Sequence, residues 1–404
     1  MDGLTLPDVD WRTRNGMAAL LDALGANEGD SRFVGGAVRD ALLGIDAKDV
    51  DIATRLKPPQ VLERLKRQAI RAVPTGIAHG TITAVLKSGP VEVTTLRRDV
   101  ATDGRRATVA FSDDWREDAA RRDFTINALY ADPSTGEIHD YFGGLADLAV
   151  RRVRFIGAPL ERIAEDHLRI LRFFRFHARF GLDRPDEEGL AACAARANDL
   201  MALSRERIAD ELLKLLAVAD PRPTVALMID RGIFTPVLPE IGIDGAARLG
   251  RVVAGESRAG IAADPVRRLA ALLPDDPVLG EAVAARLKLS NQNRKRIAAA
   301  LAGAPDALPV EAFAYRTGVA GAIDRLLLHD GDEAEIRRLA GWAPPRLPIG
   351  GGALVARGLA AGPAVARALQ TVERQWVAEG FPPAERVQAI ADEVAAMILA
   401  EAGT

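Results

Sequence analysis

The sequence predicts an α+β fold in which a small mixed domain is followed by a long, all-helical region. Three observations predict this fold. β-Branched runs alternate with short helical patterns up to about residue 150, helical patterns dominate from about residue 160 onward, and 404 residues exceed what one hydrophobic core usually supports. No fixed-period repeat indicates a solenoid. We therefore expect two or more domains.

The composition excludes several classes of protein. One cysteine, Cys193, excludes a disulfide framework and a cysteine-based zinc site. The five histidines lack the paired spacing of a histidine metal site. No apolar run approaches the roughly 18 residues of a membrane span. The first residues lack the basic and apolar pattern of a signal peptide, so we expect a cytoplasmic protein without a membrane partner.

The formal net charge of −3 argues only weakly against a nucleic-acid partner, because phosphate binding depends on local fields and not on the total charge. Only seven of the 53 basic residues are lysines. This bias towards arginine is explained by genomic base composition or by phosphate binding through planar guanidinium groups. The position of the arginines along the chain has to decide between these explanations.

The first elements are a strand, a helix, a second strand and a second helix. Residues 31–36 form a strand pattern that ends in a glycine pair, and residues 37–44 form a short helical pattern that Gly44 closes. Residues 49–54 alternate as a strand does, and residues 58–68 are helical with proline at the start.

Two hairpins and a polar segment complete the mixed domain. Residues 80–87 and 91–97 are β-branched runs joined by a turn, and residues 126–132 and 137–142 repeat this pattern. Between the hairpins, residues 98–118 are polar and have few apolar anchors, so we expect a loop. The next segment, residues 161–181, predicts one long helix.

The glycine pair Gly35 and Gly36 is a candidate phosphate-binding turn. A strand that runs into two glycines and then a helix allows backbone N–H groups to approach a phosphate closely. The pattern differs from GxGxxG, which disfavours a dinucleotide-binding fold. Arg39 lies one helical turn beyond the pair and could contact the same phosphate. A purely structural turn explains the pair alone equally well.

Three carboxylates follow on predicted strands. Asp49 and Asp51 are two residues apart, so a strand places both on one face. Carboxylates held close together repel unless cations lie between them, which suits two Mg²⁺ ions that clamp a phosphoryl transfer. Glu92 is an acid between valines and a third candidate. The alternatives are solvated edge residues for the aspartates and ordinary in–out alternation for Glu92.

The segment GG-x-VRD-x-LLG-x₄-D-x-D (35–51) resembles the signature of nucleotidyltransferases that share the DNA polymerase β type of catalytic domain. Further motifs occur in order along the chain, and together they resemble the bacterial CCA-adding enzymes, the class II tRNA nucleotidyltransferases, and their poly(A) polymerase relatives. These motifs are PTGIAHGTITAVL (74–86), VEVTTLRRD (91–99), DGRRATVAF (103–111), RRDFTINALY (121–130), DYFGGLADL (140–148) and EDHLRILRFFRF (165–176).

The resemblance implies a head with a small palm sheet, then a helical neck, body and tail. The corresponding boundaries are an N-terminal helical segment at 1–30, the head at 31–154, the neck at 155–217, the body at 218–310 and the tail at 311–404.

The resemblance also implies the activity, which is template-independent addition of CCA to tRNA 3′ ends from CTP and ATP with two Mg²⁺ ions at Asp49 and Asp51. The partners would be tRNA, CTP and ATP, and no DNA partner is expected. The segment 98–118 matches the family's flexible loop, and its intact length favours full CCA addition. Alternatives are a poly(A) polymerase, a CC-only or A-only enzyme, and a non-catalytic helical RNA-binding protein.

Four residues of the predicted helix 161–181 are candidates for binding the nucleotide and reading its base. Asp166 and Arg169 are three residues apart on the predicted helix and so side by side. In the family such a pair selects C and A, while the structural alternative is an intrahelical ion pair. Arg172 and Arg175 continue at three-residue steps, and the resemblance implies that they contact the nucleotide.

Two further groups of residues complete the candidates. The resemblance implies that Arg122 contacts the phosphates and Asp123 the ribose hydroxyl, whereas a basic patch with a capping aspartate is the alternative. A basic cluster without acids is a candidate tRNA backbone contact, with a solvated helix end as the alternative. It comprises Arg286, Lys288, Arg294, Lys295 and Arg296.

Overall fold

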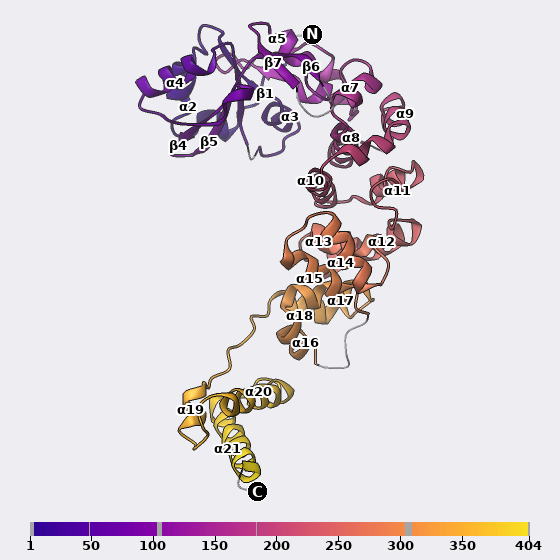
Figure 1. Ribbon diagram of the computed structural model, residues 1–404. Coiled ribbons are helices and arrows are strands. Elements are labelled where there is room, and N and C mark those ends of the chain that lie inside the picture. The colour runs from indigo at the N-terminus through magenta and orange to yellow at the C-terminus, as the bar shows by residue number, and fades with distance from the viewer. Residues whose placement is uncertain (1–3, 48, 103–106, 183, 304–308, 403–404) are drawn as a thin grey trace. The chain divides into compact units, whose positions relative to one another are not determined.

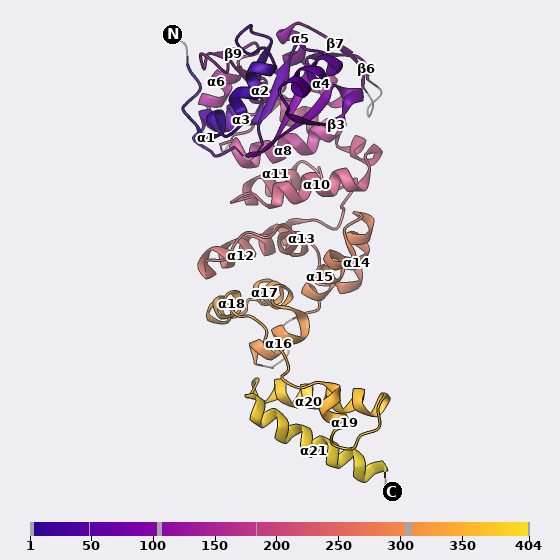
Figure 2. The same cartoon turned by 90° about the vertical axis from the view of Figure 1, so that its left-hand side faces the viewer.

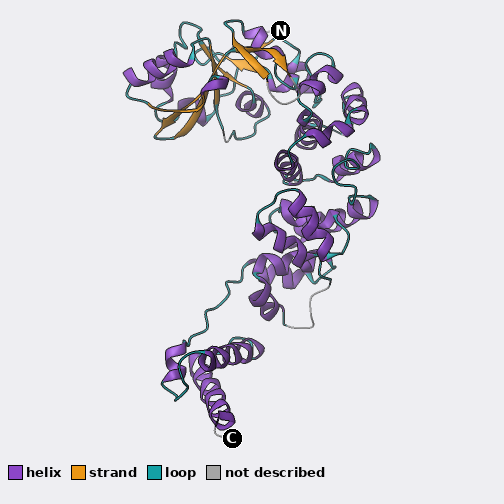
Figure 3. Cartoon of the chain, in the orientation of Figure 1, coloured by secondary structure: helices purple, strands orange, loops and turns teal. Residues whose placement is uncertain are grey.

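The computed structural model describes residues 4–47, 49–102, 107–182, 184–303 and 309–402. The chain forms two compact units, Met1–Pro239 and Glu240–Thr404. The predicted α+β class is confirmed, since all strands of the described residues lie in the first unit and the second unit is helical (Figures 1 and 3).

The first unit is built around a mixed seven-stranded sheet with the order β3-β4-β5-β2-β1-β8-β9. β2 and β5 pair in parallel, and the other neighbouring strands pair antiparallel. The strands are β1 (Ser31–Val34), β2 (Asp51–Thr54), β3 (Arg71–Gly76), β4 (Thr81–Leu86), β5 (Gly89–Thr95), β8 (Leu129–Ala131) and β9 (Ile138–Asp140).

Most local predictions for this unit are confirmed. β4–β5 and β8–β9 are the two predicted antiparallel hairpins. The predicted helices are α3 (Gly36–Leu42) and α4 (Pro58–Arg67). β3 was not predicted, because it contains a proline, a terminal glycine and a register shift between Val73 and Gly76, all of which weaken a strand pattern.

The prediction of a loop at residues 98–118 is wrong for most of the segment. β6 (Arg97–Thr102) and β7 (Ala107–Phe111) form a separate two-stranded sheet, and α5 (Trp115–Ala120) follows it. Residues 103–106 lie outside the described residues. The prediction failed because backbone hydrogen bonds hold a two-stranded ribbon together, so it needs few apolar side chains.

The sheet buries both faces. Phe33, Ile52 and Val93 lie in register across three strands, and Trp11 of α1 (Asp10–Thr13) packs edge-on against Phe33 with ring centroids 4.9 Å apart. The opposite face is covered by α5, whose Trp115 joins a buried cluster that includes the residues Val34, Ala53 and Tyr130. By strand alternation Asp51 belongs to this second face.

Shorter elements complete the sheet domain. They are α2 (Met17–Ala23), η1 (Ile77–His79), η2 (Thr125–Asn127) and α6 (Gly144–Ala149).

Helices α8 (Leu168–Phe180), α10 (Arg205–Leu216) and α11 (Arg222–Asp230) pack together after the sheet (Figure 2). The compact unit therefore runs to Pro239, beyond the neck boundary drawn at residue 217. Buried aromatic rings join these helices to the sheet domain, with Phe124 5.3 Å from Phe176 between ring centroids. The remaining elements here are α7 (Pro159–Glu165), α9 (Glu187–Ala195) and η3 (Ala197–Ala202).

The single helix predicted over 161–181 is wrong at one point. α7 ends at Glu165, and Asp166 has extended backbone angles of φ −152° and ψ 106°. The Asp166 carboxylate accepts a hydrogen bond from the Leu168 backbone N–H at 3.1 Å. Such a local side-chain bond competes with the helical hydrogen-bond pattern, so the helix stops and restarts as α8.

The second unit consists of helices, among which α20 and α21 lie side by side (Figure 2). Trp376 and Val372 belong to the core of the last three helices. No helix among the described residues is long and apolar enough to span a membrane. The helices are α12 (Ile243–Ala259), α13 (Pro265–Leu272), α14 (Pro277–Arg286), α15 (Asn291–Ala300), α16 (Val310–Thr317), α17 (Val319–Leu328), α18 (Glu333–Ala340), α19 (Gly351–Val355), α20 (Pro363–Ala378) and α21 (Ala384–Ala402).

Candidate active site

The predicted carboxylates gather where β2 and β5 run in parallel. Asp51 is the first residue of β2 and lies in register with Glu92 of β5. Asp49 lies in a bend before the strand, so the prediction that both aspartates occupy the strand is wrong. Pairing stops at Val50, whose carbonyl accepts from the Glu92 backbone N–H at 3.3 Å. Asp49 and Glu92 are exposed, while Asp51 is half-buried.

Asp51 has the chemistry of a cation ligand. Burial raises the pKa of its carboxyl to about 6, and the negative charges of Glu92 and Asp49 add to this shift, while the positive charge of Arg122 opposes it. A bound cation would remove the repulsion among these oxygens. Carboxylate oxygens are the donors that Mg²⁺ prefers.

The described residues contain no group of three or more His, Cys, Asp or Glu side chains arranged to hold a metal ion. Asp49, Asp51 and Glu92 are therefore not a preformed three-carboxylate site. Mg²⁺ is usually held by one or two carboxylates together with substrate phosphates and water. Asp49 and Asp51 fit this pattern as a pair of ligands.

The glycine turn lies beside Arg122. Gly35 has φ +73°, and a Cβ atom there would approach a terminal guanidinium nitrogen of Arg122 to 3.3 Å. Both the backbone angle and the space therefore favour glycine. The Gly35 N–H donates to the Leu129 carbonyl at 3.0 Å, so this N–H already has a backbone partner. Gly36 is the first residue of α3.

Arg39 lies inside the protein. Its side chain is 5% exposed, donates to Asp40 at 2.6 and 2.8 Å and to Asn127, and lies over the Phe180 ring at 4.0 Å. Burial lowers the pKa of the guanidinium. In this structure Arg39 thus joins α3, η2 and α8, and its predicted contact with a nucleotide stays a prediction.

Arg122 is held by a buried acid and a tyrosine. It donates to Asp118 and to the Tyr130 hydroxyl, both at 3.2 Å, and Tyr130 donates to Asp118 at 2.6 Å. The positive charges of Arg122 and Arg121 lower the pKa of Asp118 to about 2 against the opposing effect of burial. Arg122 and Asp118 therefore form a salt bridge. It fixes the Arg122 side chain between Gly35 and the carboxylates.

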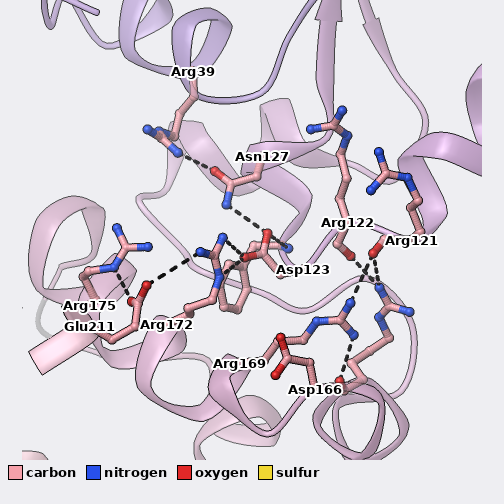
Figure 4. A network of polar contacts seen from close by, with 12 residues as sticks. Arg39, Arg121, Arg122, Asp123, Asn127, Asp166, Arg169, Arg172, Arg175 and Glu211 are labelled. Atoms are coloured by element: carbon pink, nitrogen blue, oxygen red, sulfur yellow. Dashed lines mark hydrogen bonds and ion pairs between the residues drawn. The ribbon is translucent and has the colours of Figure 1, made fainter. Parts of the chain in front are cut away.

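The Asp123 carboxylate has four donors (Figure 4). One oxygen accepts from the Phe124 backbone N–H at 2.8 Å and from the Asn127 side chain at 3.0 Å. The other accepts twice from Arg172, at 2.8 and 2.5 Å. Despite its burial, these contacts lower the Asp123 pKa to about 2, Arg172 having the largest effect. A ribose hydroxyl could bind here only by replacing one of the donors.

Arg172 and Arg175 share a buried partner, Glu211 of α10. Arg175 donates to Glu211 at 2.5 Å, and Arg172 lies 3.8 Å from the other carboxylate oxygen. Glu211 was missed by the sequence analysis. The available signal was an acid at a buried position of α10, next to Leu212 and four residues before Leu215. The network in Figure 4 thus joins α8 and α10 to the sheet domain.

Asp166 and Arg169 do not form the predicted pair on one helix. Asp166 binds Arg207 of α10 at 2.8 and 3.1 Å, whereas Arg169 binds Glu165 and the backbone carbonyls of Arg162 and Arg121. Because the helix is interrupted before α8, Asp166 and Arg169 bind different partners. Arg207 was also missed, because nothing in the sequence relates it to a residue 41 positions away.

The basic cluster of the second unit divides into two kinds of residue. Arg296 binds Asp324 and Asp264 at 2.6 and 2.8 Å with its side chain 17% exposed, which favours a structural role, and its contact with tRNA stays a prediction. Its partners lie on α17 and before α13, which no local pattern reveals. Ion pairs also engage Arg286 with Glu240 and Arg294 with Glu281, while Lys288 and Lys295 have exposed side chains.

Comparison with known proteins identifies the family. The chain is 35% identical over 398 residues to the mitochondrial CCA tRNA nucleotidyltransferase 1 of Mus musculus, covering 94% of this chain and 90% of the relative. It is 31% identical over 398 residues to a CCA-adding enzyme of Lacticaseibacillus paracasei, covering 94% and 95%. The chain belongs to the family of CCA-adding tRNA nucleotidyltransferases.

Family profiles and a solved structure agree with this membership. Residues 31–154 match the poly A polymerase head domain, and residues 184–243 match the probable RNA and SrmB-binding site of polymerase A. A crystal structure of the Bacillus stearothermophilus CCA-adding enzyme in complex with CTP is similar with a TM-score of 0.73 and 28% identity, covering 96% of this chain and 99% of that one. The resemblance seen in the sequence is thereby confirmed.

Proposed function

We propose that this protein adds C, C and A to the 3′ end of tRNA from CTP and ATP and releases pyrophosphate. The observation that carries the proposal is the crowding of Asp51 by Glu92 and Asp49 beside Arg122, in a chain similar over 94% of its length to a CCA tRNA nucleotidyltransferase. A carboxylate that neighbouring negative charges repel, next to a guanidinium held in place, suits a cation-dependent transfer of a nucleotide.

The reaction is attack of the tRNA 3′-hydroxyl on the α-phosphate, with pyrophosphate as the leaving group. Asp49 and Asp51 would hold two Mg²⁺ ions, which activate the hydroxyl and neutralise developing charge when bound. Glu92 adds negative charge beside Asp51 and is a third candidate ligand. Arg122 would bind the triphosphate with its exposed edge while Asp118 keeps its guanidinium in place.

Asp166 and Arg169 would select the base. Cytosine and adenine both present an amine donor next to a ring-nitrogen acceptor, which match a carboxylate and a guanidinium. Uracil and guanine present a carbonyl oxygen and an N–H at these places, so donor faces donor and acceptor faces acceptor. Unpaired polar groups in a desolvated site make this rejection large.

Arg172, Arg175 and Asp123 would complete the nucleotide site. The arginines have partly exposed side chains, and Asp123 would favour ribose over deoxyribose by accepting from the hydroxyl in exchange for a present donor. Substrate RNA would be bound mainly through its backbone and shape by the helical part, with Arg286, Lys288, Arg294 and Lys295 as remaining candidates.

Within this proposal the chain keeps the division into head, neck, body and tail at 31–154, 155–217, 218–310 and 311–404 after a short N-terminal segment. A cytoplasmic location also belongs to it, since the single buried cysteine fits a reducing compartment.

Sizing of reaction products tests the function. Transcripts of tRNA that end at the discriminator base, after C or after CC are incubated with each nucleotide and Mg²⁺. We expect two C residues and then one A to be added. Long A tails would instead indicate a poly(A) polymerase, and arrest after CC or failure to add C would indicate a CC-only or A-only enzyme. Absence of any product in both the wild type and Asp51→Asn would favour a non-catalytic RNA-binding protein.

A further inference from the structure

We propose that Arg207 of α10 is a positioning residue that sets which oxygen of Asp166 reads the base, and thereby determines how well C and A are separated from U and G. The inference rests on the proposed base-reading role of Asp166. Arg207 does not contact the reacting atoms in this proposal and acts only through the carboxylate.

The contact joins two elements that are distant in sequence. One terminal nitrogen of Arg207 donates to both Asp166 oxygens, at 2.8 and 3.1 Å. The side chains are 32% and 31% exposed, so both remain accessible to a ligand. A guanidinium that contacts both oxygens restricts rotation of the carboxylate about its last bond.

The number of donors shows which acceptor position remains. A carboxylate offers about four acceptor positions. Among the described residues, the Oδ1 atom of Asp166 accepts from Arg207 and from the Leu168 N–H, whereas Oδ2 accepts from Arg207 alone. One position on Oδ2 is therefore open to an amine. Asp123 differs, because both of its oxygens already have two donors each.

The place of Arg207 on its helix supports a role beyond local stability. α10 begins after the N-cap Ser204, so Arg207 lies in the first turn of the helix. A positive charge there is disfavoured by the helix dipole, and an acid would be the stabilising choice. The contact with Asp166 compensates this unfavourable position.

The two halves of the base-reading pair are held by different elements. Arg169 is bound by Glu165 and by the carbonyls of Arg162 and Arg121, independently of Arg207. A change at Arg207 should therefore disturb the acceptor that reads the amine and leave the guanidinium donor in place. The consequence is a change in selectivity between CTP and UTP, which differ at this amine, and not an equal loss for all nucleotides.

The experiment compares Arg207→Gln and Arg207→Lys with the control Lys214→Gln. Lys214 lies on the same helix and forms an exposed pair with Asp210. Equilibrium affinities for CTP, ATP, UTP and GTP are measured with tRNA lacking CCA bound, and kcat/KM for each nucleotide is measured separately. We expect Arg207→Gln to reduce the CTP:UTP affinity ratio at least about tenfold. Arg207→Lys should fall between it and the wild type, because an ammonium keeps the positive charge but lacks the rigid planar group that holds the carboxylate in one orientation.

An equal fall for all four nucleotides, or an unchanged ratio, would overturn the inference. Melting temperatures identify a variant that does not fold, and if Arg207→Gln fails, a wild-type ratio in Arg207→Lys overturns it. Addition of CCA by the wild type with an unchanged ratio in the variants would reject only the inference. A wild type that binds CTP selectively through Arg207 but adds no nucleotide would reject only the proposed function. A wild type that shows no selectivity at all would reject both.

Discussion

Two networks of arginines and carboxylates, one in each compact unit, use the same ion-pair chemistry but differ in the exposure of their arginine side chains. The site network joins Asp123, Asn127, Arg172, Arg175 and Glu211 with Arg39. The body network joins Glu256 of α12, Arg267 and Arg268 of α13, Arg296 of α15 and Asp324 of α17. Both bury the acids and pair them with guanidinium groups.

The networks differ in what their arginines leave open. In the body network Arg267 and Arg268 have side chains only 6% and 3% exposed, so solvent and ligands hardly reach them. In the site network the side chain of Arg172 is 30% exposed, so part of it remains accessible to a ligand. Charge buried on all sides makes a fold depend on pairing, whereas charge with one open side can also bind phosphate. The comparison teaches that the exposure of the individual arginine, and not pairing as such, distinguishes Arg172 from Arg267 and Arg268.

The largest expected effect is on turnover. Asp51→Asn should lower kcat/KM for CTP by more than about 10³-fold, because it removes a negative oxygen from the proposed cation site. Unfolding by urea should show no loss of stability, since the change also removes repulsion from Glu92 and Asp49. Chelation should abolish wild-type activity, and Mg²⁺ should restore it. The matched control Asp46→Asn removes an exposed carboxylate from the same loop and should keep full activity.

The body network should show the opposite behaviour. Asp324→Asn removes the buried charge that Arg267 and Arg296 share, although Arg267 stays paired with Glu256 and Arg296 with Asp264, and should lower the free energy of unfolding of the second unit by about 3 kcal/mol. The KM for nucleotides should stay unchanged. Glu281→Gln, which breaks the exposed pair with Arg294, should cost less than about 1 kcal/mol. Equal losses for both variants would contradict the contrast between buried and exposed pairs.

The pH dependence of stability sharpens the comparison for Asp123. Its pKa is about 2 in the folded protein against an ordinary 3.8, so the folded state favours the ionised form. This contribution, roughly 2 kcal/mol, is fully present above about pH 4 and is lost as the pH falls towards 2. Urea unfolding between pH 6 and 3 should therefore show a smaller decline for Asp123→Asn than for the wild type. Parallel curves would show that Arg172 does not hold the carboxylate as described.

The smallest effect concerns RNA binding by the basic cluster. Lys295→Gln should weaken tRNA binding only a few-fold and reduce the slope of log K against log salt by about 1, because it removes one phosphate contact. Arg296→Gln should leave this slope unchanged and lower the melting temperature, since Arg296 belongs to the body network. Titrations at several salt concentrations measure both. An equal change of slope in the two variants would place Arg296 at the RNA surface after all.

Local patterns determined much of the fold. The strand that ends in the glycine pair and both hairpins follow from residues that are close in sequence, and the alternation and turn signals there predict them correctly. The predictions failed where a local side-chain bond ended a helix at Asp166 and where the strands 97–102 and 107–111 paired with few apolar anchors. In both places the structure depends on hydrogen bonds that hydrophobic periodicity does not reveal.

The sequence by itself thus determined the class of fold, the family and the glycine turn of the site, because each depends on short-range spacing, whereas the register of Asp51 with Glu92 came from strand pairing. Only the tertiary structure decided which arginines bind and which stabilise. The contacts Asp123–Arg172, Asp166–Arg207 and Glu211–Arg175 span 49, 41 and 36 residues. Arginine side chains are long and pair with whichever carboxylate the packing of helices brings within reach. Their roles therefore follow from the positions and exposure of these partners in the folded chain.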